Sequence, residues 1–157
     1  MIKKATKKDL NECLDVLHQA YDIVAKNFNI TAQNSPYRGN ADLPYEEFLK
    51  AYKTNLIFCY KLESKIAGII NFEIKENICR IHDLAVLPSY QNQQIGTKIL
   101  NFVIYFCKKE GIQKIKLGMI DDNKKLKKWY EKFGFKTIET IQYDKAPYLV
   151  GKMEKLM

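Results

Sequence analysis

The stretch that decides the fold is Ile81-His82-Asp83-Leu84-Ala85-Val86-Leu87-Pro88-Ser89-Tyr90-Gln91-Asn92-Gln93-Gln94-Ile95-Gly96-Thr97. An apolar strand ends in a polar turn, and the turn opens an amphipathic helix that runs to about Lys109. The first N–H groups of such a helix have no acceptor within it, and the helix dipole adds partial positive charge there. The junction therefore predicts an anion site suited to phosphate, although an ordinary loop-to-helix junction has the same residues.

Size and composition predict one domain, residues 1–157, whose core is large enough to be stable without disulfides or a structural metal. Hydrophobic residues make up 46% of the chain and charged residues 28%, which is ordinary for a folded domain. No apolar run approaches the roughly 20 residues of a membrane span, and Met1–Thr6 has no signal-peptide core. We therefore expect a cytoplasmic protein with no membrane partner.

The cysteines and histidines predict neither disulfides nor a metal site. The four cysteines are far apart in sequence and form no C-x-x-C pair, which favours free thiols in a reducing compartment. A zinc site needs clustered ligands, and the chain has two histidines, His18 and His82.

The net charge of +8, from 26 Lys and Arg against 18 Asp and Glu, indicates an anionic partner. Nucleic acid, acidic lipid and a polyphosphate cofactor all qualify, and so does a solvated lysine-rich surface with no partner. The sole dense run is Lys124–Lys128, and no nucleic-acid-binding motif occurs. Nucleic acid is therefore not expected as a partner.

Outward from the junction, apolar periodicity predicts alternating helices and strands. A capping box, Thr6-Lys7-Lys8-Asp9, opens the first helix. The polar loop Asn27–Leu43 is long for a compact domain, which is typical of functional loops. Short links predict an antiparallel meander, and the junction helix, ending at Gly111, predicts a parallel crossover. The expected elements are strand Ile2–Ala5, a helix to about Lys26, helix Tyr45–Tyr52, strands Leu56–Leu62, Ile66–Ile74 and Ile78–Leu87, the junction helix, strand Ile112–Met119, helix Asn123–Lys132, and strands Phe135–Gln142 and Tyr148–Met153.

A wider pattern resembles the GNAT family of acetyl-CoA-dependent N-acetyltransferases. It comprises Val86-x-Pro88, Tyr90-Gln91-x-x-x-Ile95-Gly96-x-x-x-Leu100, Asn123 and Trp129-Tyr130-Glu131-Lys132-Phe133-Gly134-Phe135. The resemblance implies an α/β (α+β) fold: a mixed, mostly antiparallel sheet of about seven strands with about four helices on both faces. The family signature is Gln or Arg, two residues, Gly, one residue, then Gly or Ala. Gln91 and Gly96 match, but Gln94 replaces the first glycine, where it either crowds the pyrophosphate or hydrogen-bonds to it.

The resemblance also implies how acetyl-CoA binds, with no metal. Backbone N–H groups of the junction would hold the pyrophosphate, and the strand before it would pair with the pantetheine arm like an added strand. Asn123 would hydrogen-bond the pantetheine or the region near the thioester. The implied cofactor-binding residues are Leu84, Ala85, Val86, Gln91, Gln93, Gln94, Ile95, Gly96, Thr97 and Asn123.

Tyr130, His82 and Asp83 are the candidate catalytic residues. The resemblance places Tyr130 at the thioester sulfur, and a phenol with a pKa near 10 suits protonation of a leaving thiolate. His82 titrates near neutrality, which suits removal of a proton from the attacking ammonium group. Asp83 would hold the cation or act through water, and alternation predicts that His82 and Asp83 face opposite ways. Ordinary roles stay open: a core aromatic for Tyr130, and satisfied strand polar groups for the other two.

The loop Ser35-Pro36-Tyr37-Arg38 lies where the family forms its acceptor pocket. Tyr37, Arg38 and Tyr45 would line that pocket, with Arg38 suited to a carboxylate on the acceptor. A plain surface loop is the alternative.

The sequence thus predicts acetyl transfer to a primary amine by direct attack in a ternary complex, without an acyl-enzyme. The acceptor is a small molecule or a peptide of undetermined identity. An exposed edge strand near the C-terminus would support a homodimer. The alternative function is a non-catalytic coenzyme A-binding sensor, which the Gln94 departure motivates.

Overall fold

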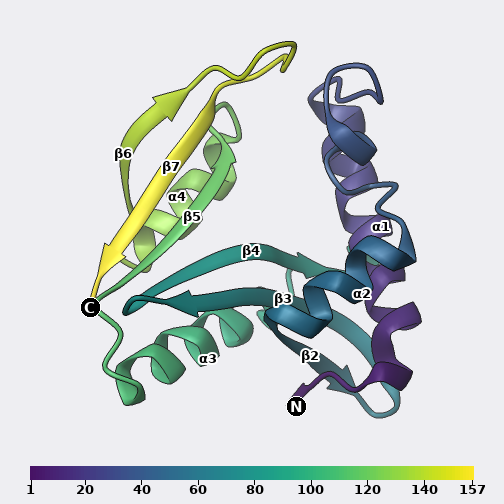
Figure 1. The fold of residues 1–157 in the computed structure, drawn as a ribbon, viewed down its shortest axis with the longest axis vertical. Coiled ribbons are helices and arrows are strands. Elements are labelled where there is room, and N and C mark those ends of the chain that lie inside the picture. The colour runs from purple at the N-terminus through teal and green to yellow at the C-terminus, as the bar shows by residue number, and fades with distance from the viewer.

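A seven-stranded sheet with the order β1-β2-β3-β4-β5-β7-β6 organises the computed structural model, which describes residues 1–157 (Figure 1). The β4–β5 pair is parallel and every other neighbouring pair is antiparallel. The fold class inferred from the sequence is therefore confirmed. The strands are β1 (Ile2–Lys4), β2 (Leu56–Leu62), β3 (Lys65–Lys75), β4 (Ile78–Val86), β5 (Lys114–Ile120), β6 (Lys136–Ile141) and β7 (Val150–Leu156).

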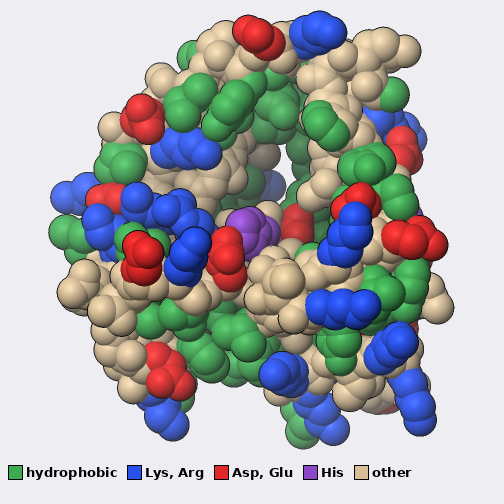
Figure 2. Space-filling view, in the orientation of Figure 1, with side chains coloured by type: hydrophobic (Ala, Val, Ile, Leu, Met, Phe, Trp, Pro, Cys, Tyr) green, Lys and Arg blue, Asp and Glu red, His purple; other side chains and the backbone are tan.

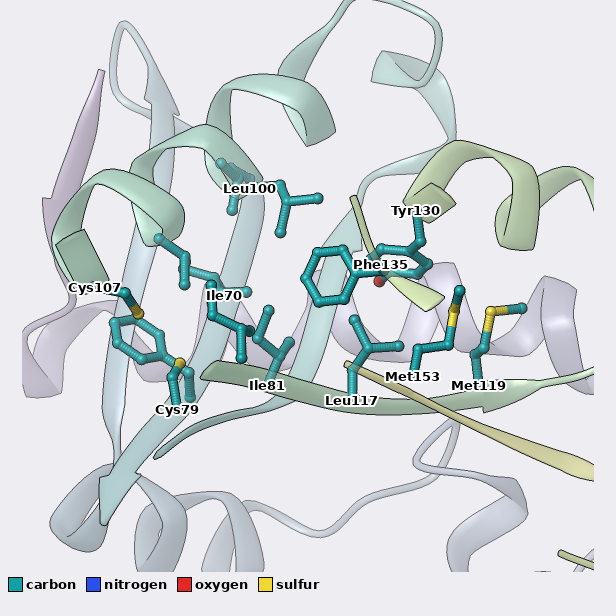
Figure 3. Close-up of a cluster of buried hydrophobic side chains, with 14 of the residues drawn as sticks. Ile70, Cys79, Ile81, Leu100, Cys107, Leu117, Met119, Tyr130, Phe135 and Met153 are labelled. Carbon is teal, nitrogen blue, oxygen red and sulfur yellow. The ribbon is translucent and has the colours of Figure 1, made fainter. Parts of the chain in front are cut away.

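Helices cover the sheet in two layers, each with its own apolar cluster. One cluster joins α1 and α2 to β2, β3 and β4, and the other joins α3 and α4 to the opposite face. Figure 3 shows part of the second cluster, in which Leu100 of α3 and Tyr130 of α4 lie on the same side of the sheet. None of the helices combines the length and apolar character that a membrane span requires. The helices are α1 (Leu10–Asn27), α2 (Tyr45–Thr54), α3 (Ile95–Lys109) and α4 (Lys124–Lys132).

Gly68 of β3 lets α3 pack closely against the sheet. A Cβ atom at this position would lie 2.8 Å from Ile99 Cδ1 and 3.2 Å from the carbonyl oxygen of Ala85. A side chain here would force the tip of Ile99 to shift and would crowd the backbone oxygen of Ala85, so the glycine lets α3 approach β3 and β4 closely. This close packing fixes the start of α3 relative to the end of β4.

All predicted elements occur in the predicted order, with shifted ends. The strand expected from Ile112 begins at Lys114, because Ile112 is buried and its N–H donates to Cys107 O at the end of α3. The last strand runs to Leu156 rather than Met153, because its polar end still pairs with β5. Backbone pairing here extends past the apolar pattern.

The two parallel strands pair at one end and then diverge. Their register covers three pairs, from Ile78 opposite Lys114 to Arg80 opposite Lys116. Beyond Arg80, β4 continues along β3 while β5 follows β7, and Figure 1 shows the two strands separating. The divergence opens a gap in the sheet, and the candidate site lies in that gap.

A β-bulge marks the start of the divergence. In the β3–β4 ladder Asn71 faces Asp83 and Phe72 faces Ile81, so His82 is an extra residue in β4. Bulges bend a strand and redirect its side chains. The bulge therefore turns the candidate catalytic residues of β4 toward the gap.

Candidate active site

A cavity of about 440 Å³ occupies the gap between β4 and β5. Its walls come from α1, the loop after α1, the two strands and α4. Most of the lining is apolar, and Asp83 is its one carboxylate. The lining residues are Tyr21, Val24, Ile30, Ser35, Pro36, Gly39, Asn40, Ile81, His82, Asp83, Leu84, Leu117, Gly118, Met119, Ile120, Asn123, Leu126, Tyr130, Tyr148 and Val150.

A second groove, of about 300 Å³, continues from this cavity across β5, β7 and β6. The two share Ile81, His82, Leu117 and Gly118, so they meet where the strands diverge. Figure 2 shows the hollow at the centre of this face of the molecule. The site is therefore open along the sheet as well as toward the helices.

Asp83 is buried, with 5% of its surface exposed, and three neutral groups donate to it. Tyr21 Oη lies 3.1 Å and Asn40 Nδ2 3.3 Å from Oδ1, while Asn71 Nδ2 lies 2.9 Å from Oδ2. Asn55 Nδ2 in turn donates to Asn71 Oδ1 at 3.0 Å. The network supports a buried negative charge without a neighbouring cation.

Tyr21 is the residue of this network that sequence reasoning missed as functional. Burial raises the pKa of the Tyr21 phenol well above its usual value, and the nearby charge of Asp83 adds to the increase. The hydroxyl thus stays protonated and donates to Asp83. Tyr21 fits the apolar face of α1, so periodicity hid it, whereas Asn71 inside the apolar run of β3 was a visible signal.

His82 lies beside Asp83 on the same face of the sheet, which corrects the alternation argument. Its Nε2 is 2.9 Å from Glu73 Oε1, while Asp83 contacts Asn71, and Glu73 and Asn71 are alternate residues of β3. The bulge places both β4 side chains on one face. The His82 side chain is 41% exposed and lines both cavities, so protons from solvent reach it.

Tyr130 lines the cavity from the side of α4. Its ring meets Trp129 and Phe135 edge to face, with centroids 5.0 and 5.6 Å apart, and 6% of the residue is exposed (Figure 3). Its hydroxyl has no hydrogen-bond partner in the chain, and burial raises the pKa of the phenol. Tyr130 is therefore a core aromatic whose polar end faces the cavity with its proton retained.

The junction presents a row of unpaired backbone donors. None of the N–H groups of residues 92–97 has an acceptor in the chain, and pairing resumes with Lys98 N–H to Gln94 O at 3.0 Å. Gln94 has φ 65° and ψ 13°, the left-handed conformation that favours glycine, and its side chain is exposed. Gln94 therefore adopts the glycine geometry and leaves the donor row open.

The other predicted cofactor residues divide into available and engaged groups. Leu87 N–H donates to Ala67 O at 2.8 Å, so by alternation the polar groups of Ala85 face β3, and those of Leu84 and Val86 face the gap. Gln91 Nε2 donates to Val86 O at 3.2 Å. The backbone of Ala85 is thus committed to the sheet.

Gly96 lies beside Trp129 and Val86, and Asn123 lines the cavity. A Cβ at Gly96 would meet Trp129 at 3.6 Å, an ordinary contact, so the glycine is not required by space inside the chain. Asn123 caps α4 through Oδ1, which accepts from Leu126 N–H at 3.3 Å, and it lines the cavity with its amide nitrogen free.

The long loop lines the cavity with other residues than those predicted. Ser35, Pro36, Gly39 and Asn40 reach it, but Tyr37, Arg38 and Tyr45 do not. Tyr37 and Arg38 have φ of 52° and 48°, a left-handed turn that leaves Tyr37 43% exposed. Tyr45 begins α2 and packs against the cluster under α1.

Arg38 instead ties the loop to α1. Its guanidinium lies 3.0 Å from Asp22 and 2.7 Å from Asp42. Arg38 lowers the pKa of the Asp42 carboxyl group, while Lys26 and then Arg38 lower that of Asp22. Because two carboxylates already hold Arg38, it has no free charge for an acceptor.

The four cysteines are free and buried, and no group of three potential metal ligands occurs.

Comparisons with known proteins agree with this geometry. The family model described as "Acetyltransferase (GNAT) family" matches residues 17–135. An uncharacterized N-acetyltransferase, MJ1207, of Methanocaldococcus jannaschii is 24% identical over 149 residues, which are 90% of this chain and 62% of that protein. The chain thus spans less than two thirds of that relative's length.

Two further similarities are to bacterial and archaeal proteins. A putative [ribosomal protein bS18]-alanine N-acetyltransferase of Bacillus subtilis is 23% identical over 125 residues, 79% of this chain and 77% of that protein. The crystal structure of PaiA N-acetyltransferase from Thermoplasma acidophilum, in complex with coenzyme A, superposes with a TM-score of 0.83 at 21% identity. The superposition covers 100% of this chain and 98% of the PaiA chain.

Proposed function

The chain belongs to the GNAT family of acetyltransferases, and from that premise we propose that it transfers the acetyl group of acetyl-CoA to a primary amine. The observation that carries the proposal is the buried carboxylate in the cavity between β4 and β5, together with the row of free N–H donors at the start of α3. The donors suit a diphosphate, and the carboxylate suits an ammonium group.

The junction and the gap fit coenzyme A. Backbone N–H groups of Gln93, Ile95, Gly96 and Thr97 would hold the pyrophosphate, since none has an acceptor in the chain. The edge of β4 that faces the gap, at Leu84 and at the N–H of Val86, would pair with the pantetheine arm, and the Asn123 amide would donate near its end. The complex of PaiA with coenzyme A, on the same fold, supports coenzyme A as the ligand. When bound, acetyl-CoA supplies an acyl group activated as a thioester.

Asp83 and His82 would prepare the amine. A lysine-like amine has a pKa near 10.4 and arrives as ammonium, and the buried carboxylate of Asp83 attracts it. His82 lies on the same face of β4 and reaches solvent, so it accepts one ammonium proton and releases that proton to water. Asp83 is then the positioning group and His82 the base, with Glu73 orienting the imidazole.

Tyr130 would act on the other partner. As the amine nitrogen bonds to the acyl carbon, the carbon–sulfur bond breaks and the sulfur needs a proton. The Tyr130 hydroxyl is protonated, unpaired and at the cavity wall, so it would donate that proton, and the second proton lost by the amine nitrogen would restore the hydroxyl. None of the four cysteines lines the cavity, which supports direct attack without an acyl-enzyme.

The test is Tyr130→Phe, assayed by thiol release across a panel of amines and peptides. The Tyr130 hydroxyl has no partner in the chain, so we expect the variant to fold normally. Turnover should fall about 10²- to 10⁴-fold with little change in acetyl-CoA affinity. Tyr105→Phe is the matched control, because Tyr105 lies exposed on α3. Unchanged turnover would exclude Tyr130 as the acid. Binding of acetyl-CoA without acetylation of any amine would instead indicate a sensor.

A further inference from the structure

The sheet has one uncovered face over β5 and β7. Their buried residues, such as Leu117 and Met153, pack toward α4, while Lys116, Gly118 and Lys152 alternate on the opposite face. In Figure 1, α4 lies behind these strands and no helix lies in front of them. The groove of about 300 Å³ runs along this open face.

Positive charge exceeds negative charge in this groove. Arg80, Lys116 and Lys152 line it, against the single carboxylate of Glu139. Arg80 is exposed, and neither Arg80 nor Lys152 has a carboxylate within 4.0 Å. Figure 2 shows Lys and Arg side chains gathered beside the central hollow on this face. The groove therefore complements an anionic ligand.

Two acidic side chains beside the groove are already engaged. Glu154 lies 3.8 Å from Lys114 and 4.0 Å from Lys116, so one carboxylate is shared between two lysines. Glu73 is paired with His82. Neither of these carboxylates pairs with Arg80 or Lys152, and the carboxylate left in the groove is that of Glu139, the register partner of Lys152.

The groove is continuous with the catalytic cavity. Both include His82 and Gly118. Arg80 is two residues from His82, about 6.6 Å along a strand. The register partner of Arg80 in β5 is Lys116. An extended chain advances about 3.3 Å per residue. A chain whose amine lies beside His82 and Asp83 thus reaches these cations with its second or third residue.

We propose that the acceptor is the N-terminal amine of an extended peptide that carries acidic side chains at its second and third residues. The proposal rests on the acetyltransferase function above and names its substrate class. The amine enters the cavity toward Asp83, and the acidic residues lie across β5 and β7 against Arg80, Lys116 and Lys152. Charge complementarity and continuity with the cavity both favour this occupant.

The test uses the full chain, acetyl-CoA and peptides of one length that differ at residues two and three: Asp-Glu, Asn-Gln or Lys-Arg. For the Asp-Glu peptide we expect KM to be about tenfold lower than for Asn-Gln, with similar kcat, because rim charges chiefly alter association. Arg80→Glu with Lys152→Glu should remove the preference or reverse it toward Lys-Arg. Lys4→Glu with Lys53→Glu applies the same charge change at exposed positions outside both cavities and should leave it intact.

Each outcome separates this proposal from the acetyltransferase function. Acetylation of all three peptides with equal KM overturns the acidic-peptide proposal alone. Free aspartate or glutamate acetylated as well as the peptide shows a small-molecule acceptor and overturns it too. Tight binding of single-stranded RNA at 0.15 M salt, lost in the Arg80/Lys152 double variant, would assign the groove to nucleic acid. No acetylation of any amine overturns the proposed function itself. Thermal unfolding of each variant verifies that it is folded.

Discussion

Gln94→Gly should stabilise this protein, although it removes a side chain. Gln94 has φ 65° and ψ 13°, and its exposed side chain makes no hydrogen bond within the chain. A residue with a Cβ pays about 1–2 kcal/mol in the left-handed region, a cost that glycine does not have. The substitution therefore removes strain and loses no contact.

The opposing effect is the greater freedom of glycine in the unfolded chain, which costs about 0.4–1 kcal/mol. The difference predicts a net gain of about 0.5–1 kcal/mol, or a Tm about 1–3 °C higher for a chain of this size. Gln93→Gly is the matched control, because Gln93 is the neighbouring exposed glutamine and does not have a positive φ. It should lose about 0.4–1 kcal/mol.

Urea unfolding of the two variants and the parent protein, followed by circular dichroism, measures the difference. Gln94→Gly should be more stable than the parent and Gln93→Gly less stable. The free energies of unfolding of the two variants should therefore differ by about 1–2 kcal/mol. Equal destabilisation by both would refute the left-handed geometry at Gln94. A calorimetric titration with acetyl-CoA provides a second measurement. If the Gln94 side chain does not cover the N–H donors, the affinity of Gln94→Gly for acetyl-CoA should equal or exceed that of the parent.

Two further predictions concern the frame around the site. Hydrogen bonds from Thr6 N–H, at 2.8 Å, and Lys61, at 3.1 Å, lower the pKa of Asp9 in the folded chain. Ionised Asp9 therefore stabilises the fold at pH values above its unfolded-state pKa. This stabilisation is lost as the pH falls through the lower pKa of the folded state. Asp9→Asn should lower the free energy of unfolding by about 1 kcal/mol at neutral pH. In guanidinium unfolding at about pH 2, the variant and the parent should be equally stable. A stability difference that does not change with pH would contradict the ionic role. Gly68→Ala should cost about 1–3 kcal/mol, because its Cβ meets Ile99 at 2.8 Å, whereas Gly96→Ala, with its nearest contact at 3.6 Å, should be nearly neutral in the same thermal melts.

The fold was predictable because its signals are local. Apolar periodicity identified each helix and strand, and the short links at Glu63–Ser64 and Glu76–Asn77 required antiparallel neighbours. The crossover through α3 required the parallel β4–β5 pair. What the pattern did not predict was where pairing stops. Ile112 is apolar but belongs to the end of α3, whereas Leu156 is exposed and still pairs with Lys114.

The site was less predictable because it depends on contacts between distant residues. Strict alternation put His82 and Asp83 on opposite faces, and the bulge at His82 has no sequence signal. Tyr21 lies 62 positions from Asp83 and reads as an apolar residue of its helix, so only the folded chain joins them. Part of the long loop lines the cavity, but the left-handed turn at Tyr37 and Arg38 brings Gly39 and Asn40 there instead of the predicted residues.

The divergence of β4 and β5 explains why binding and chemistry share one location. Where the strands pair, at Ile78 to Arg80, backbone groups satisfy each other and no ligand has access. Where they part, the edge of β4 needs new partners, which the strand-like arm of the proposed cofactor would supply. The same parting frees the bulged His82 and the buried Asp83 to face the gap from one side, while Tyr130 closes it from the other. Under the proposed function, the divergence would thus provide both the edge that pairs with the cofactor and access to the proposed acid and base. A change that extended the β4–β5 ladder past Arg80 should abolish cofactor binding and turnover together.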